Sequence, residues 1–159
     1  MNHSKHKITS WENLKSRITS WQDQGEKVVF SNGCFDILHF GHIDYLEQAR
    51  RLGDRLVIGL NSDGSVCSLK GPNRPVNAEN ARARILAALQ FVDGITVFSE
   101  ETPKELIEYL LPDVLVKGAD YEIENIVGAK TVLENGGEVK TINLVKGYST
   151  TNIIDSLKS

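Results

Sequence analysis

Short blocks of consecutive apolar residues alternate with segments of helical periodicity along most of this chain. Residues 28–30, 56–58 and 114–116 are such blocks, and each is followed by a loop and then by a helical pattern. An apolar block without polar alternation is typical of a strand that is buried on both faces of a parallel sheet. Strands that alternate with helices are joined by crossover connections. The pattern therefore predicts an α/β fold with a single doubly wound, mainly parallel five-stranded sheet.

Glycine, proline and capping residues divide the chain into its expected elements. Thr9 and Glu12 have the spacing of a capping box, and Gly136-Gly137 ends a helical pattern. We expect residues 1–26 to be an N-terminal tail and helix, frayed over 1–8, ahead of one domain over 27–159. The expected strands are 27–32, 55–60, 95–98, 113–117 and 138–144, the expected helices are 9–24, 42–52, 78–92, 103–111, 124–135 and 149–158, and 61–64 and 70–77 are a turn and a loop.

Composition and charge exclude several classes of protein. The chain has 159 residues, 40% of them hydrophobic and 25% charged, which fits one soluble domain with a real core. Its net charge of −3 disfavours a large nucleic-acid interface, and no apolar run is long enough for a membrane span. Cys34 and Cys67 lie far apart, which indicates neither a disulfide framework nor a zinc site. With no secretory signal expected, we predict a cytoplasmic protein.

Two histidines follow the first predicted strand directly. His39 and His42 are three residues apart, which places them on one side of a helix start, and Gly41 between them permits a close approach to the backbone. A helix start also offers free N–H groups and the positive end of a dipole. Metal binding is the alternative, but no third ligand is obvious nearby in the sequence. The pattern favours a phosphate site, where Asp36 could orient a histidine or assist a metal.

Further polar residues follow other predicted strands or begin other predicted helices. Ser149, Thr150 and Thr151 begin the last helix, where they either cap it or bind phosphate. Arg82 falls on the inward face of its helix, so it needs an anionic partner. That partner is either an aspartate in a structural ion pair or a bound phosphate. Further candidate ligand-binding residues lie on loops or at strand ends, at the same edge of the predicted sheet. These are Lys70, Arg74, Lys117, Gly118 and Asp120.

The string Asn-Gly-Cys-Phe-Asp-Ile-Leu-His-Phe-Gly-His over residues 32–42 resembles the signature of the HxGH nucleotidyltransferase superfamily, and in particular of ADP-heptose synthases. The resemblance extends over about residues 27–157, through segments 56–63, 69–71, 74–77, 112–121 and 148–154. It implies a Rossmann-like fold and an adenylyltransferase that joins ATP, with Mg²⁺, to D-glycero-D-manno-heptose 1-phosphate.

The resemblance also implies roles for individual residues. The expected catalytic residues are His39, His42, Lys70 and Arg82. The expected substrate-binding residues are Asp63, Lys70, Arg74 and Asp120. The expected nucleotide-binding residues are Cys34, Phe35, Asp36, His39, Gly41, His42, Lys117, Gly118, Tyr148, Ser149, Thr150 and Thr151. No metal ligand is expected from the protein.

The same resemblance leaves alternative functions open and implies partners. A cytidylyltransferase acting on glycerol 3-phosphate would share the phosphate-binding residues, and a non-catalytic nucleotide-binding domain could share the fold. A dinucleotide-dependent oxidoreductase is disfavoured because no GxGxxG follows the first strand. The sugar-kinase domain of the bifunctional relatives is absent, so we expect a separate heptose kinase to act upstream. Trp11 and Trp21 share one helical stripe, which is expected to pack on the domain itself or, alternatively, in a homodimer contact.

Overall fold

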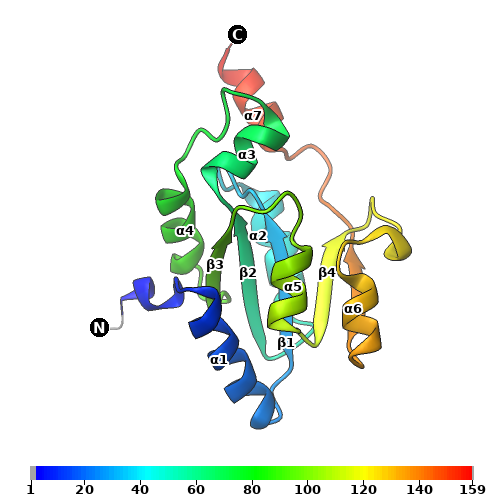
Figure 1. The fold of residues 1–159 in the computed structure, drawn as a ribbon. Coiled ribbons are helices and arrows are strands. Elements are labelled where there is room, and N and C mark those ends of the chain that lie inside the picture. The colour runs from blue at the N-terminus through cyan, green and yellow to red at the C-terminus, as the bar shows by residue number, and fades with distance from the viewer. Residues whose placement is uncertain (1–2, 159) are drawn as a thin grey trace.

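Five parallel strands form one sheet in the order β3-β2-β1-β4-β5 (Figure 1). The structure is a computed structural model and describes residues 3–158. The sheet confirms the expected fold class, with every strand pair parallel. The strands are β1 Val28–Gly33, β2 Arg55–Asn61, β3 Gly94–Phe98, β4 Val114–Gly118 and β5 Glu138–Ile142; the helices are η1 Ser4–Lys7, α1 Trp11–Asp23, α2 Phe40–Arg50, α3 Asp63–Lys70, α4 Glu79–Ala88, α5 Lys104–Leu110, η2 Ile123–Asn125, α6 Ala129–Glu134 and α7 Thr150–Leu157.

The strand order reverses beside β1, and this reversal places the ligand-binding edge. The chain runs outward from β1 to β2 and β3, then returns to the other side of β1 for β4 and β5. β1 pairs with β2 along its full length, up to Gly33↔Leu60, whereas its pairing with β4 is limited to Val29↔Val114 and Phe30↔Leu115. The carboxyl ends of β1 and β4 are therefore not tied together, which leaves a crevice where open α/β sheets bind ligands.

The core is divided into two layers by the sheet. Alternate side chains of each strand point to opposite faces, so Val29 belongs to one apolar cluster and Phe30 to the other. The first cluster holds α2 and α4 against the sheet, and the second holds α1, α5 and α6 against the opposite face (Figure 1). Apolar strands buried on both faces are what the continuous apolar blocks of the sequence predict.

Residues 3–8 are part of this packing rather than a frayed tail, and residues 1 and 2 of the expected tail lie outside the described residues. Ser4–Lys7 forms a 3-10 helix, Ile8 bridges to Ile95, and Lys7 Nζ donates to the Leu89 carbonyl. The cap of α1 is Ser10, whose side chain accepts from Asn13 N, so the expected capping box at Thr9 is wrong by one residue.

Helix α1 lies across the edge of the second apolar cluster. Its Leu14 and Ile18 are fully buried there, with Trp11 and Trp21 packed at the margin of that cluster. Trp11 Nε1 also donates to the Val97 carbonyl. The tryptophan stripe therefore packs on its own domain.

Two other segments differ from the sequence prediction. Residues 63–70 form helix α3 instead of a turn, because Ser62 accepts from Ser65 N and caps the first helical turn. The expected helix over 124–135 is a 3-10 turn followed by the shorter α6, which begins after Gly128 at φ 84°. Both segments bury few side chains, so helical periodicity is weak there. Within residues 3–158, no helix combines the length and the apolar character needed to cross a membrane.

Candidate active site

A cavity of about 570 Å³ opens at the carboxyl ends of β1, β2 and β4. It lies at the strand-order reversal, beside the N-termini of α2 and α7 (Figure 1). Most of the residues expected to act in the site line this cavity. These are Cys34, Phe35, Asp36, His39, Gly41, His42, Lys70, Arg74, Lys117, Gly118, Asp120, Tyr148, Ser149, Thr150 and Thr151.

The histidine pair stands at the beginning of α2. His39 is the N-cap, and its Nδ1 accepts from Gly41 N at 3.1 Å, while His42 Nδ1 accepts from His39 N at 3.3 Å. The two rings stack with centroids 3.8 Å apart. Because each Nδ1 accepts a backbone hydrogen bond, the proton of each neutral ring is on Nε2. Two N–H donors on neighbouring rings are thereby available to one anionic ligand.

Burial keeps both imidazoles neutral. Desolvation and the neighbouring His39 ring lower the pKa of His42 to about 4, against an ordinary value of 6.5. Burial also lowers the pKa of His39. At neutral pH both rings are therefore neutral hydrogen-bond donors rather than cations. A Cβ on Gly41 would lie 2.9 Å from His39 Cε1, so only glycine leaves room for this ring arrangement.

Asp36 organises the loop before α4 rather than a histidine or a metal. Its buried carboxylate accepts from Val76 N at 2.7 Å, from Asn77 N at 2.9 Å and from Arg74 Nε at 2.9 Å. Burial acts to raise the pKa of Asp36, but these hydrogen bonds together bring it below the ordinary value. The neighbouring Phe35 adopts a positive φ of 46°, a strained conformation typical of functional loops.

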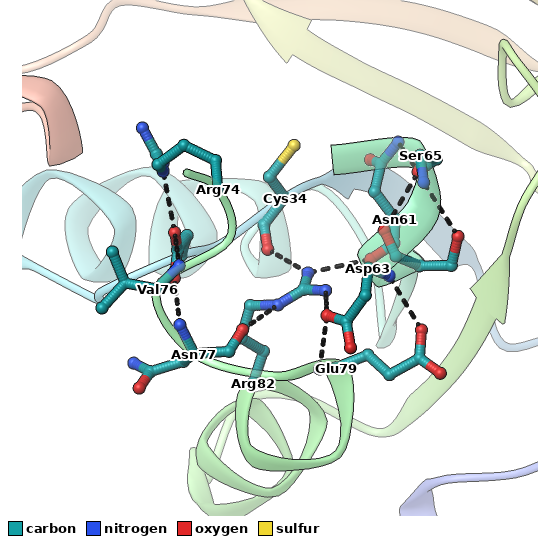
Figure 2. Close-up of polar contacts among 11 residues, drawn as sticks. Cys34, Asn61, Asp63, Ser65, Arg74, Val76, Asn77, Glu79 and Arg82 are labelled. Atoms are coloured by element: carbon teal, nitrogen blue, oxygen red, sulfur yellow. Dashed lines mark hydrogen bonds and ion pairs between the residues drawn. The ribbon is translucent and has the colours of Figure 1, made fainter. Parts of the chain in front are cut away.

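Arg82 and Asp63 are not among the residues that line the cavity, and Figure 2 shows the polar contacts that they make instead. The fully buried Arg82 guanidinium donates to the carbonyls of Cys34, Asn61 and Asn77 and to Asp63 Oδ1, at 2.7–2.9 Å. Asp63 Oδ1 also accepts from Glu79 N. With its donors directed at protein oxygens, Arg82 fits the structural ion pair. Through these contacts Arg82 and Asp63 hold the strand ends beside the cavity, and the expected roles of both residues toward substrate stay predictions.

The last helix joins the histidine loop directly. Ser149 caps α7 by accepting from Asn152 N, and Thr150 Oγ1 donates to the Asp36 carbonyl at 2.6 Å. The N-termini of α2 and α7 therefore border one cavity. The ring of Tyr148 lies edge-on to Phe40, with centroids 5.2 Å apart, at the mouth of the cavity.

The cavity also contains residues that the sequence patterns did not single out. Tyr45 comes from the core-facing side of α2, where its hydroxyl donates to the Val116 carbonyl. Asn32 and Asn61 are strand residues within segments 32–42 and 56–63 of the resemblance, which gave them no role in the site. Their position at strand ends beside a strand-order reversal is a signal that could have found them. The lining residues that were not expected as site residues are Asn32, Gly33, Tyr45, Asn61, Leu69, Glu101, Pro103, Tyr121, Leu144 and Val145.

Comparison with known proteins identifies similar chains. The family described as Cytidylyltransferase-like matches residues 30–156. The chain is 55% identical over 153 residues to the bifunctional protein HldE of Magnetococcus marinus, and 52% identical over 151 residues to that of Haemophilus influenzae. These matches cover 96% and 95% of this chain but only 31% and 32% of the relatives, so the chain spans about a third of their length.

Solved structures share the fold. The lipopolysaccharide core biosynthesis protein from Thermoplasma volcanium has a TM-score of 0.62 at 29% identity, over 79% of this chain and 100% of that one. Pantoate-beta-alanine ligase from Francisella tularensis has a TM-score of 0.61 at 17% identity, over 95% of this chain and 76% of that one. At that identity the second likeness concerns the fold alone.

Proposed function

We propose, from the premise that this chain belongs to the cytidylyltransferase-like family, that it transfers an adenylyl group from ATP to D-glycero-D-manno-heptose 1-phosphate. The products are ADP-heptose and pyrophosphate. The observation that carries the proposal is the convergence of two helix N-termini and two Nε2–H donors on one cavity. The HldE relatives and the resemblance of segments 32–42, 112–121 and 148–154 to ADP-heptose synthases support this acceptor.

The proposed reaction is a direct in-line displacement. An oxygen of the sugar phosphate attacks the α-phosphorus of ATP, and the bond from that phosphorus to the bridging oxygen of the β-phosphate breaks. The attacking oxygen is already ionised, so the protein has no proton to remove. Its contribution is to position the two phosphates and to stabilise the charge that develops between them. His39 and His42 donate from Nε2 to the transferring group.

The triphosphate needs a second binding element. The N-terminus of α7, with Ser149, Thr150 and Thr151, is suited to the β- and γ-phosphates. Lys70 and Arg74 line the same cavity and supply positive charge.

Magnesium would enter as the MgATP complex. Residues 3–158 contain no cluster of three or more His, Cys, Asp or Glu side chains arranged to hold a metal ion. The Asp36 carboxylate is occupied by three protein donors. The ion would therefore be coordinated by phosphate oxygens and water, where it offsets the negative charge of the triphosphate.

The proposal places this protein in a sequence of reactions. A heptose kinase would supply the sugar 1-phosphate that the proposed reaction consumes. The proposed location of the protein in the cell is the cytoplasm, where ATP is available. The proposed oligomeric state is a monomer or a homodimer.

Pyrophosphate release tests the proposal. Release should require Mg²⁺, ATP and heptose 1-phosphate together, and omission of any one should abolish it. CTP with glycerol 3-phosphate should give much less product. Activity with that pair alone would overturn the substrate assignment but keep nucleotidyl transfer. ATP binding without pyrophosphate release from any tested pair of nucleotide and acceptor would overturn both.

A further inference from the structure

Asn32 carries a buried polar atom without a partner. Its Oδ1 is the one buried side-chain nitrogen or oxygen atom, within residues 3–158, that has no hydrogen-bond partner. An unsatisfied buried polar atom costs about 1–3 kcal/mol, so a folded protein rarely keeps one without a reason. Asn32 also lines the cavity. A ligand hydroxyl or amine that donates to Oδ1 would supply the missing hydrogen bond.

Lys117 is the neighbour of Asn32 across the crevice. The β1–β4 pairing ends at Phe30↔Leu115, and Asn32 and Lys117 each lie two residues beyond it, where the crevice opens. Phe30 and Leu115 both belong to the apolar cluster under α5, so the alternation of strand side chains directs Asn32 and Lys117 to the α5 face as well. Both residues line the cavity, so one ligand can contact them together.

The Lys117 ammonium makes no hydrogen bond or salt bridge within residues 3–158. Its Nζ lies 5.7 Å from the centre of the Tyr121 ring, and the charge of the Asp120 carboxylate acts on it from beyond salt-bridge distance. Burial lowers the pKa of Lys117, so the site would gain from an oxygen acceptor. One donor group and one acceptor atom thus stand unpaired on the same face of the sheet.

Glu101 distinguishes the side of the cavity that Asn32 and Lys117 line from the side that is proposed to bind phosphate. Its carboxylate comes from the loop before α5 and lines the cavity together with Asn32 and Lys117. A carboxylate would repel a triphosphate but accept hydrogen bonds from hydroxyl groups. The histidine pair belongs to α2, which packs on the opposite face of the sheet.

We propose that Asn32, Glu101 and Lys117 form the subsite for the hydroxyl-bearing carbon skeleton of the acceptor, and that Asn32 and Lys117 determine acceptor specificity. This inference rests on the proposed function, since it names the acceptor half of the same site. Each hydroxyl of a sugar both donates and accepts, which matches an amide oxygen, a carboxylate and an ammonium in one pocket. The nucleotide then occupies the side of α2 and α7, so in this proposal Lys117 acts on the acceptor and not on the nucleotide, which is the role that the resemblance implies for it.

Steady-state kinetics of Asn32→Ala and Lys117→Gln test the subsite. We expect the KM for the sugar 1-phosphate to rise about 10–100-fold in each, because each variant removes a polar contact to the acceptor, while the KM for ATP stays within about twofold. Asn135→Ala and Lys130→Gln, at exposed positions outside the cavity, are the matched controls and should leave both KM values unchanged. An equal rise in the KM for ATP, or no change in either KM, would overturn the inference.

Two further measurements separate this inference from folding and from the proposed function. Asn32→Ala should melt no lower than the wild type, since it removes an unsatisfied buried atom, whereas a structural role predicts a lower Tm. Calorimetric binding of the sugar 1-phosphate, in the presence of a non-hydrolysable ATP analogue, should weaken in Asn32→Ala. If the wild type binds the sugar phosphate but releases no pyrophosphate, the proposed function fails and this binding difference still decides the subsite. If the wild type binds no sugar phosphate, the subsite is overturned as well.

Discussion

At the scale of single residues, the histidine pair combines a structural and a chemical role. The Nδ1 atoms of His39 and His42 cap α2, and that same contact fixes their protons on Nε2. Sequence spacing predicts that the two rings share one side of a helix start, and the structure confirms it. The ring stacking and the suppressed protonation depend on burial, which a spacing of three residues does not specify.

The His42→Ala variant tests the chemical role. We expect turnover to fall by roughly 10²–10³, because a donor directed at developing charge acts mainly in the transition state. The affinity for ATP should change much less. The measurement is kcat from pyrophosphate release alongside ATP binding by calorimetry, with exposed His6→Ala as the control. Near-normal turnover in a folded His42→Ala protein would remove His42 from the catalytic assignment.

At the scale of elements, Arg82 ties three segments together. Its guanidinium joins α4 to the residues that follow β1 and β2, through the carbonyls of Cys34 and Asn61 and the carboxylate of Asp63 (Figure 2). The helical stripe of the sequence correctly predicts that Arg82 points inward. It does not distinguish a phosphate partner from a protein partner, because both choices satisfy the same buried charge.

Replacing Arg82 should therefore destabilise the protein before it affects binding. Arg82→Ala leaves three carbonyls and Asp63 without their donor, which we expect to cost about 3–5 kcal/mol. Thermal unfolding should show a clearly lower Tm, while exposed Arg51→Ala melts like the wild type. ATP should still raise the Tm of the variant. A normal Tm with no stabilisation by ATP would instead assign Arg82 to the phosphate site.

The link between α7 and the histidine loop is a second test at this scale. Thr150 Oγ1 donates to the Asp36 carbonyl at 2.6 Å, which connects the two helix starts that border the cavity. Thr150→Val keeps the shape of the side chain but removes the hydroxyl. We expect the KM for ATP to rise about 3–10-fold with little change in Tm, since one hydrogen bond contributes about 0.5–1.5 kcal/mol. Thr151→Val serves as the comparison at the next position. An unchanged KM for ATP in Thr150→Val would contradict a functional role for the hydrogen bond between α7 and the histidine loop.

At the scale of the whole molecule, the sequence predicts the layout of the fold better than its irregular parts. Apolar blocks buried on both faces identify the strands, and their parallel pairing follows from the intervening helices. Helix α3 is missed because its Gly, Ser and Asp residues favour turns, whereas the Ser62 cap and the burial of Ser65 and Val66 stabilise it. Asn32 and Glu101 enter the site through strand order and loop placement. These arise from pairings between distant segments, which no local pattern encodes.

The stability of the whole molecule should depend on pH through its buried titratable groups. The pKa of His42 is about 4 in the folded protein and near 6.5 when unfolded, so the unfolded chain binds more protons between these values. The contribution of His42 to the free energy of unfolding is therefore present in full above pH 6.5. It falls by about 2–3 kcal/mol as the pH drops toward 4. Burial raises the pKa of Tyr45 to about 12, which predicts a second loss as the pH rises above 10. Urea unfolding from pH 4 to 7 should show the first loss in the wild type. His42→Gln should reduce this loss to the part that comes from other groups with lowered pKa values, such as His39, while His6→Gln leaves it in place. An undiminished slope in His42→Gln would mean that the fold does not hold the His42 imidazole neutral.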